Sequence, residues 1–225
     1  MVIASVVIVF FLIFAFCKMP SFKQEEQVAP FFQIVGHLLK RARFIEGVFA
    51  QLFYAGAQIM CWAFIIHYGM EQVGLSLSEA QNYNIIKMAI FLTSRFICTF
   101  LMRYLRPSII LLIFALGGFG CTLGAIHVEG QSGLISLVMV SACMSLMFPT
   151  IYGIALKGLK LEEAKLGSAF LIMSIVGGAV LTKLQGGLIT NCRVHTSFWL
   201  PASCFVMIAC LQCFLAHDKS DNNKA

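Results

Sequence analysis

Long apolar runs without charged residues recur along this sequence, and they limit what it can fold into. The clearest, residues 49–68, reads FAQLFYAGAQIMCWAFIIHY and contains no Asp, Glu, Lys or Arg. About 20 such residues form a helix that crosses the hydrocarbon core of a bilayer. Strands of a membrane barrel would instead alternate polar and apolar residues. We therefore predict an all-α, polytopic membrane protein with seven transmembrane helices.

Composition agrees with this class and argues against others. Charged residues make up 12% of the chain, against about 25% in globular domains. The net charge of +6 does not indicate a nucleic-acid partner, because the basic residues lie between apolar runs, where they act as topology signals. The nine cysteines fall mostly inside those runs, and neither they nor any other residues show the spacing of a metal site. No cofactor is expected.

The first run, Val2–Cys17, is followed by Lys18. A cleaved signal peptide is the alternative, but its basic residues would precede the apolar run. We predict a membrane helix at 1–18, a cytoplasmic basic linker with a surface helix at 19–43, a six-helix bundle at 44–216 and a cytoplasmic tail at 217–225. The bundle's spans are expected at Ile45–Tyr68, Tyr83–Tyr104, Ile109–His127, Gly133–Leu156, Gly167–Ile189 and Ser197–Ala216.

Basic residues gather on one side of this topology, which places the amino terminus outside and the carboxyl terminus in the cytoplasm. The opposite side keeps only Arg193, and three basic residues fall within spans. The expected inner residues are Lys18, Lys23, Lys40, Arg41, Arg43, Arg103, Arg106, Lys157, Lys160, Lys165, Lys219 and Lys224.

The first span of the bundle carries a polar stripe. Its members share a sector of roughly 80° at about 100° per residue. Unpaired amides in hydrocarbon cost a few kcal/mol, so this face must look at other helices or at a watery cavity. We interpret it as one wall of a solute pathway, formed by Gln51, Tyr54, Gln58 and Trp62.

The second span repeats the pattern over roughly 100°. Lys87 lies about a turn from the outer end, and we expect it to extend to the headgroups. Arg95 lies deeper in the span. It could have a gating or pairing role, or its side chain could extend inward toward Arg103, and the sequence favours neither alternative. The shared sector holds Asn84, Lys87, Phe91, Ser94 and Arg95.

Two later spans carry small polar residues. Ser141, Ser145, Phe148 and Tyr152 align within about 60°, and Pro149 removes an amide donor beside them. Helix packing with serines bonded to their own carbonyls is one interpretation; a sugar site with hydroxyl partners and a ring face is the other. In the next span, Ser174, Gly178 and Thr182, with Gly177 alongside, indicate close helix approach.

Four segments resemble the carboxyl-terminal half of the L-fucose permease family, which consists of sugar:proton symporters of the major facilitator superfamily. They read FAQLFYAGAQIMCWAFIIHYG, NYNIIKMAIFLTSRFICTFLMRYLRP, SACMSLMFPTIYGIALKGL and GSAFLIMSIVGGAVLTKLQGG, within Phe44–Phe214. The resemblance implies two six-helix bundles with substrate near the midplane, with residues 1–18 as the sixth helix. It assigns cavity-lining roles to Gln58, Trp62, Phe91 and Phe148.

The predicted substrate-binding set adds residues that share faces with those four, and a second set has gating or structural roles. Phe148 departs from the family, where Tyr also occurs, and Lys183 stands where Pro is common. The added residues are Gln51, Tyr54, Asn84, Ser145 and Tyr152, and the gating or structural set is Arg95, Pro149, Gly177 and Gly178.

The resemblance further implies a small sugar, L-fucose or a related hexose, and a proton as partners, in a bacterial inner membrane. The family's proton-binding acidic residues lie in the other half. We therefore expect a complementary amino-terminal half and no transport by this chain alone, whether it is a truncated product or part of a split carrier. A seven-span receptor is the alternative. An intramembrane enzyme would need paired catalytic groups at one depth, and none is found.

Overall fold

The computed structural model describes residues 11, 31–102, 104, 107–128, 130–191 and 194–221. The predicted first span and the linker up to residue 30, apart from Phe11, lie outside the described residues. The chain forms two compact units, Met1–Phe31 and Phe32–Ala225, and the helices that carry the candidate site all belong to the second.

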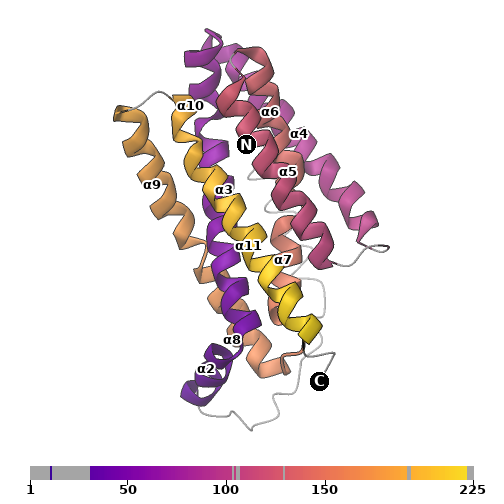
Figure 1. Cartoon of the computed structure of the whole chain (residues 1–225). Helices are drawn as coiled ribbons and strands as arrows, with labels where there is room; N and C mark the ends of the chain where they lie inside the picture. The colour runs from indigo at the N-terminus through magenta and orange to yellow at the C-terminus, as the bar shows by residue number, and fades with distance from the viewer. Residues whose placement is uncertain are drawn as a thin grey trace. The chain divides into compact units, whose positions relative to one another are not determined.

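Every regular element in the described ranges is a helix (Figure 1), as the apolar runs predict. The helices are α2 (Phe31–Lys40), α3 (Ala42–Gln72), α4 (Leu77–Leu101), α5 (Pro107–His127), α6 (Gln131–Met144), α7 (Met147–Leu156), α8 (Leu161–Met173), α9 (Val176–Asn191), α10 (Val194–Ser197) and α11 (Trp199–Asp221).

Six helical stretches are long and apolar enough to cross a membrane, and they match the six spans predicted for the bundle. Three consist of a single helix, whereas α6 with α7, α8 with α9, and α10 with α11 combine into one span each. The chain is therefore an integral membrane protein. The candidate spans are Ala42–Gln72, Leu77–Leu101, Pro107–His127, Gln131–Leu156, Leu161–Thr190 and Val194–Cys213.

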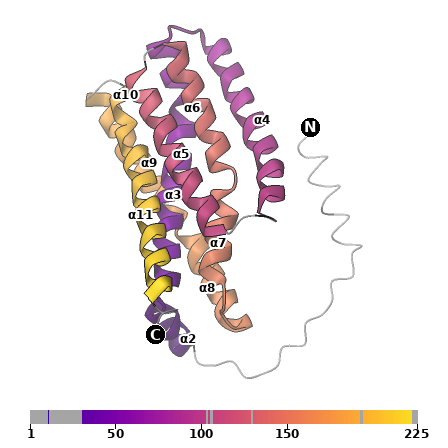
Figure 2. The same ribbon diagram turned by 45° about the vertical axis from the view of Figure 1, so that its right-hand side comes forward.

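Helix α3 occupies the centre of the bundle and packs against α4, α6, α7, α9 and α11 (Figures 1 and 2). Small residues allow these close approaches, since packing rather than water exclusion holds helices together in lipid. A Cβ at Gly47 would lie 3.3 Å from the Ala155 backbone on α7, and one at Gly56 would collide with Leu181 on α9.

The turn between α3 and α4 shows how the sequence ends one helix and begins the next. Gly74 adopts φ +73°, a conformation that favours glycine. Ser76 and Glu79 then form a reciprocal cap, in which the Ser76 amide and hydroxyl donate to Glu79 Oε2 at 2.9 and 2.8 Å. Such a capping box satisfies amide donors at a helix start.

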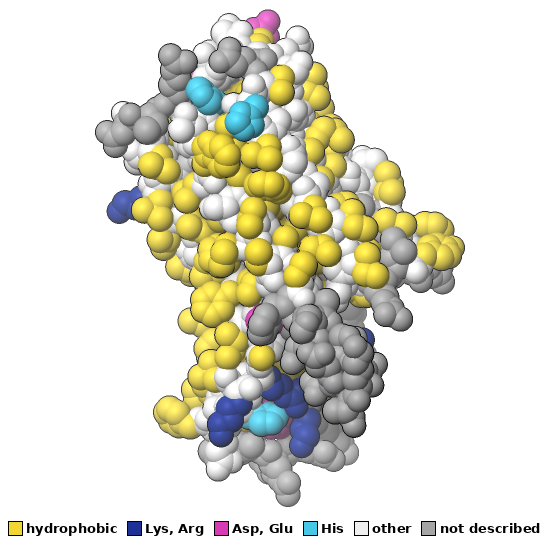
Figure 3. Space-filling model, viewed as in Figure 1, with side chains coloured by type: hydrophobic (Ala, Val, Ile, Leu, Met, Phe, Trp, Pro, Cys, Tyr) yellow, Lys and Arg dark blue, Asp and Glu magenta, His cyan; other side chains and the backbone are white. Residues whose placement is uncertain are grey.

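Helix α4 is the least buried span: only 6% of its most apolar window is buried. It stands at the edge of the bundle in Figure 2, and its large apolar side chains Ile85, Leu92, Phe96 and Ile97 are exposed. The view in Figure 3 shows hydrophobic side chains over the middle of the molecule and basic ones gathered near one end, as expected for a bundle that crosses a bilayer.

Candidate functional site

Two spans are interrupted near their middles. Helix α6 ends at Met144 and α7 begins at Met147, while α8 ends at Met173 and α9 begins at Val176. The joining residues Ser145, Leu146 and Ser174 keep right-handed helical dihedral angles, so each span changes its local hydrogen bonding without unwinding. A local irregularity inside a helix often marks a functional hinge, and these two depths are therefore candidates for a solute site.

A serine stands at each break and bonds to its own helix. Ser145 Oγ donates to the Ala142 carbonyl at 2.8 Å, and Ser174 Oγ donates to the Leu171 carbonyl at 2.7 Å. Pro149 lies in the first turn of α7, where its missing amide donor costs little. The first break was predicted from Pro149, but the second was not, because Gly167–Ile189 reads as one continuous span.

An aromatic pair joins α3 to α4. The rings of Trp62 and Phe91 meet edge to face, with centroids 5.0 Å apart and an interplanar angle of 86°. The Trp62 indole nitrogen is buried and has no hydrogen-bond partner among the described residues. A ring face and an unused N–H donor are what an aromatic sugar platform needs.

Lys87 completes this pair, and the expectation that it extends to the headgroups is wrong. Its side chain is 1% exposed, and Nζ lies 5.0 Å from the centroid of the Trp62 ring. A cation over an indole face gains about 2 kcal/mol when desolvated, which offsets part of the cost of burial. The sequence places Lys87 one turn before Phe91 on the same face of its helix, but it does not show which helix that face meets.

A second aromatic group lies deeper along α3. The Tyr54 ring meets Phe148 of α7 at 6.1 Å, and Phe148 stacks on Tyr152 at 6.2 Å with an angle of 13°. The Tyr54 hydroxyl donates to the Met144 carbonyl at 3.1 Å, at the end of α6. Tyr54 thereby ties the central helix to the interrupted span.

The predicted polar stripe on α3 is enclosed by neighbouring helices to different degrees. Gln51 is fully buried, and neither of its amide atoms has a hydrogen-bond partner among the described residues. Gln58, near the middle of α3, is half-buried, as is Asn84 on α4. Arg95 is exposed but lies within electrostatic range of the Tyr54 phenol.

Gly177 and Gly178 lie apart from these aromatic groups and bring α9 against α3. A Cβ at Gly178 would lie 2.6 Å from Ile59 Cδ1 and 3.2 Å from the Ala55 carbonyl oxygen, and one at Gly177 would collide with Leu52. This is the close helix approach that their spacing predicts.

The arrangement provides amides, an indole N–H, a buried cation and ring faces, but no described Asp or Glu lies near the middle of a span. The described residues also contain no group of three potential metal ligands. Such a wall is suited to binding a neutral polyol by hydrogen bonds and ring contacts, and it lacks a carboxylate that could carry a proton.

Comparison with known proteins agrees with this description, although no protein-family model matches the chain. The chain is 50% identical over 212 residues to the L-fucose-proton symporter of Haemophilus influenzae, covering 91% of this chain and 49% of that protein. It is 30% identical over 214 residues to the L-fucose-proton symporter of Escherichia coli, covering 92% and 49%. A glucose/galactose transporter of Brucella abortus is 28% identical over 200 residues, covering 88% and 48%.

The crystal structure of the Escherichia coli fucose:proton symporter matches with a TM-score of 0.85 at 30% identity, covering 95% of this chain and 53% of that one. A second structure, of the same transporter in the outward conformation, gives 0.84. Fold and site thus define a helical membrane bundle of the major facilitator superfamily. The chain belongs to the L-fucose symporter family within it, and it spans about half the length of the curated relatives it matches.

Proposed function

We propose that this chain forms the carboxyl-terminal bundle of a sugar:proton symporter and supplies one wall of a sugar cavity near the membrane midplane. The strongest support is the α6–α7 break beside Tyr54 and Phe148, about two helical turns along α3 from the Trp62–Phe91 pair. L-fucose is the first substrate to test, because two relatives are named as L-fucose-proton symporters.

In this proposal the wall residues have separate roles. Trp62, Phe91 and Phe148 offer ring faces, while Gln58 and Asn84 offer amides to sugar hydroxyls; Gln51 is fully buried in the bundle, so it would reach a sugar only after the helices around it move. Ser145 and Tyr152 border the same surface, although the Ser145 hydroxyl is already bonded within its helix. Arg95 and Pro149 act in gating, and Gly177 and Gly178 in helix packing.

Proton coupling belongs to the complementary half, since the described mid-span positions hold no carboxylate. We place the bundle at 44–216, after a helix at 1–18 and a cytoplasmic linker at 19–43, with a tail at 217–225. The amino terminus is outside and the carboxyl terminus inside a bacterial inner membrane, as the basic residues indicate. Half of a two-bundle carrier has nothing to move against, so the 225 residues expressed alone are expected not to accumulate sugar.

Uptake of labelled L-fucose tests this proposal in cells that lack their own fucose carrier. The chain is expressed alone, or together with the half of the Haemophilus influenzae relative that it does not cover. We expect uptake only from the pair, and Trp62→Ala in the pair should reduce it at least tenfold. Uptake by the chain alone, or a pair unaffected by Trp62→Ala, would contradict the proposal.

Fluorescence provides a direct binding test, because the chain has two tryptophans. In Trp199→Phe, Trp62 is the remaining tryptophan of this chain, and L-fucose should quench its emission in a pair whose complementary half has its tryptophans replaced by Phe. Trp62→Phe is the matched control, and the exposed Trp199 should not respond.

A further inference from the structure

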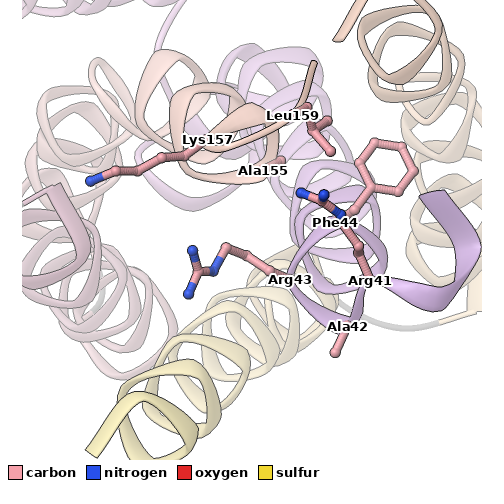
Figure 4. Close-up of a pocket in the computed structure, with 7 residues that line it drawn as sticks. All are labelled: Arg41, Ala42, Arg43, Phe44, Ala155, Lys157 and Leu159. Atoms are coloured by element: carbon pink, nitrogen blue, oxygen red, sulfur yellow. The ribbon is translucent and has the colours of Figure 1, made fainter. Parts of the chain in front are cut away.

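A pocket of about 270 Å³ lies between the start of α3 and the turn that connects α7 to α8. In Figure 4, the Arg43 and Lys157 side chains extend toward the same open side, and Arg41 lies beside Phe44. None of the lining residues belongs to the proposed sugar wall, so the pocket is a separate feature. It is lined by Arg41, Ala42, Arg43, Phe44, Ala155, Lys157 and Leu159.

The pocket is positively charged. The basic side chains that line the pocket have one acidic partner among the described residues: Glu163 Oε2 lies 3.9 Å from Arg41 Nη2, while its Oε1 lies 2.7 Å from His37 Nδ1. Arg43 and Lys157 are exposed and make no ion pair with a described residue. Two cations on one side of a pocket repel each other, and an anion placed between them would remove that repulsion.

The backbone around the pocket is preorganised for an anion. Arg41 Nη1 donates to the Gly158 carbonyl at 2.9 Å, and Gly158 adopts φ +81°, which a side chain would disfavour. Arg41 is also the N-cap of α3, with no side-chain cap bond. The amino end of this long helix therefore adds positive potential and amide donors to the three side chains.

Apolar groups beside the cations indicate which anion fits. The pocket lining also holds Phe44 and Ala155, which are nearly fully buried. The pocket lies at Ala42, where a candidate membrane span begins. Cations at the start of a span match the interface of a membrane, where phosphate groups lie next to acyl chains.

We propose that this pocket binds the phosphate group of an anionic phospholipid, with Arg43 and Lys157 as its principal charged partners and Arg41 as a fixed third cation. The site would anchor the start of α3 to the leaflet on that side. This inference is independent of sugar transport, since it uses no residue of the proposed sugar wall.

Native mass spectrometry of the purified 225-residue chain tests the proposal in neutral detergent with phosphatidylglycerol or phosphatidylcholine. We expect preferential retention of phosphatidylglycerol. The pair Arg43→Gln with Lys157→Gln should reduce that retention about 30-fold, the equivalent of about 2 kcal/mol for two basic residues. The matched control, Lys165→Gln with Lys183→Gln, removes two exposed cations outside the pocket and should change retention less than twofold.

Two further measurements are needed. One distinguishes a loss of charge from a loss of folding, and the other distinguishes lipid binding from the binding of free phosphate. Arg43→Lys with Lys157→Arg keeps the charge and should retain phosphatidylglycerol, while Lys157→Gln alone, in an exposed turn, should lose about fivefold. Inorganic phosphate at matched ionic strength should not displace the lipid. Equal retention of phosphatidylcholine, unchanged binding in folded Lys157→Gln, or full displacement by inorganic phosphate would each overturn the proposal.

Discussion

At the residue scale, two tyrosine hydroxyls of α3 donate to backbone carbonyls at or near helix ends. Tyr54 bonds the Met144 carbonyl at 3.1 Å, and Tyr68 bonds the Ala125 carbonyl at 2.7 Å. Each phenol is 1% exposed. A buried hydroxyl without a partner is costly, so these bonds fix how α3 sits against α6 and α5.

Tyr54→Phe should therefore destabilise the bundle by about 1–2 kcal/mol, because the Met144 carbonyl loses its donor while the ring contact with Phe148 is kept. Thermal unfolding of the purified chain in detergent measures this as a lower melting temperature. Tyr152→Phe is the control, since Tyr152 is half-buried and its hydroxyl has no bond among the described residues. An equal effect of both substitutions would contradict the assigned bond.

Lys87 gives a second prediction at this scale. Lys87→Met removes a cation that is costly to bury, so stability should be unchanged or higher. The cation–π contact that orients Trp62 would be lost, however. In a Trp199→Phe background, the Trp62 emission maximum should shift with Lys87→Met and stay in place with Lys87→Arg. A maximum unchanged by Lys87→Met would show that the cation does not hold the ring.

At the element scale, Gly47 sets the distance between α3 and α7, because it faces the Cβ and backbone of Ala155 rather than a flexible side-chain end. Gly47→Ala would force α3 away from the Ala155 backbone, at a cost of about 1–3 kcal/mol. Gly153→Ala, on α7 two residues from Ala155, has nothing within 4 Å and should be neutral or stabilising by about 0.5–1 kcal/mol. Chemical unfolding of the two variants, measured in parallel, compares them directly.

Glu163 connects α2 to α8, and its carboxylate also accepts from the Lys160 amide at 3.1 Å. Glu163→Gln should loosen α2, because the neutral amide loses the ion pair with Arg41 and weakens the contact with His37 Nδ1. Hydrogen exchange of the α2 amides should then be faster, whereas Glu162→Gln, whose carboxylate has no ion pair among the described residues, should leave exchange unchanged. Unchanged exchange in Glu163→Gln would show that α2 is held by its apolar face alone.

The spans were predictable because about 20 apolar residues in succession have few other folds. The face shared by Trp62 and Phe91 was also accessible, since helical spacing places residues on one side of each span. Spacing cannot say which helix faces that side. The Lys87 contact with Trp62 and the break at Ser174 both depend on neighbours distant in sequence, so they emerged only from the packing.

At the scale of the whole molecule, α4 lies at the edge of the bundle, packed against α3 and α6 on one side. It carries Phe91 and Lys87 toward α3, yet its remaining surface is almost entirely exposed. A helix that contributes to the proposed sugar wall and leaves its other faces uncovered is expected to meet the second bundle along one of them. Identifying what covers the exposed apolar face of α4, lipid or the complementary half, would therefore test the proposed arrangement.

Photo-crosslinking should distinguish the two kinds of contact. Benzoylphenylalanine placed at Leu92 or Phe96, which are 57% and 73% exposed on α4, should crosslink the co-expressed complementary half of the relative, because we expect the second bundle to cover this exposed face. The same probe at Ile113 of α5, 56% exposed, should crosslink lipid only. Crosslinks to protein at Ile113 but at neither α4 position would mean that the second bundle meets a different face, and the proposed wall would then lie on the outside of the transporter.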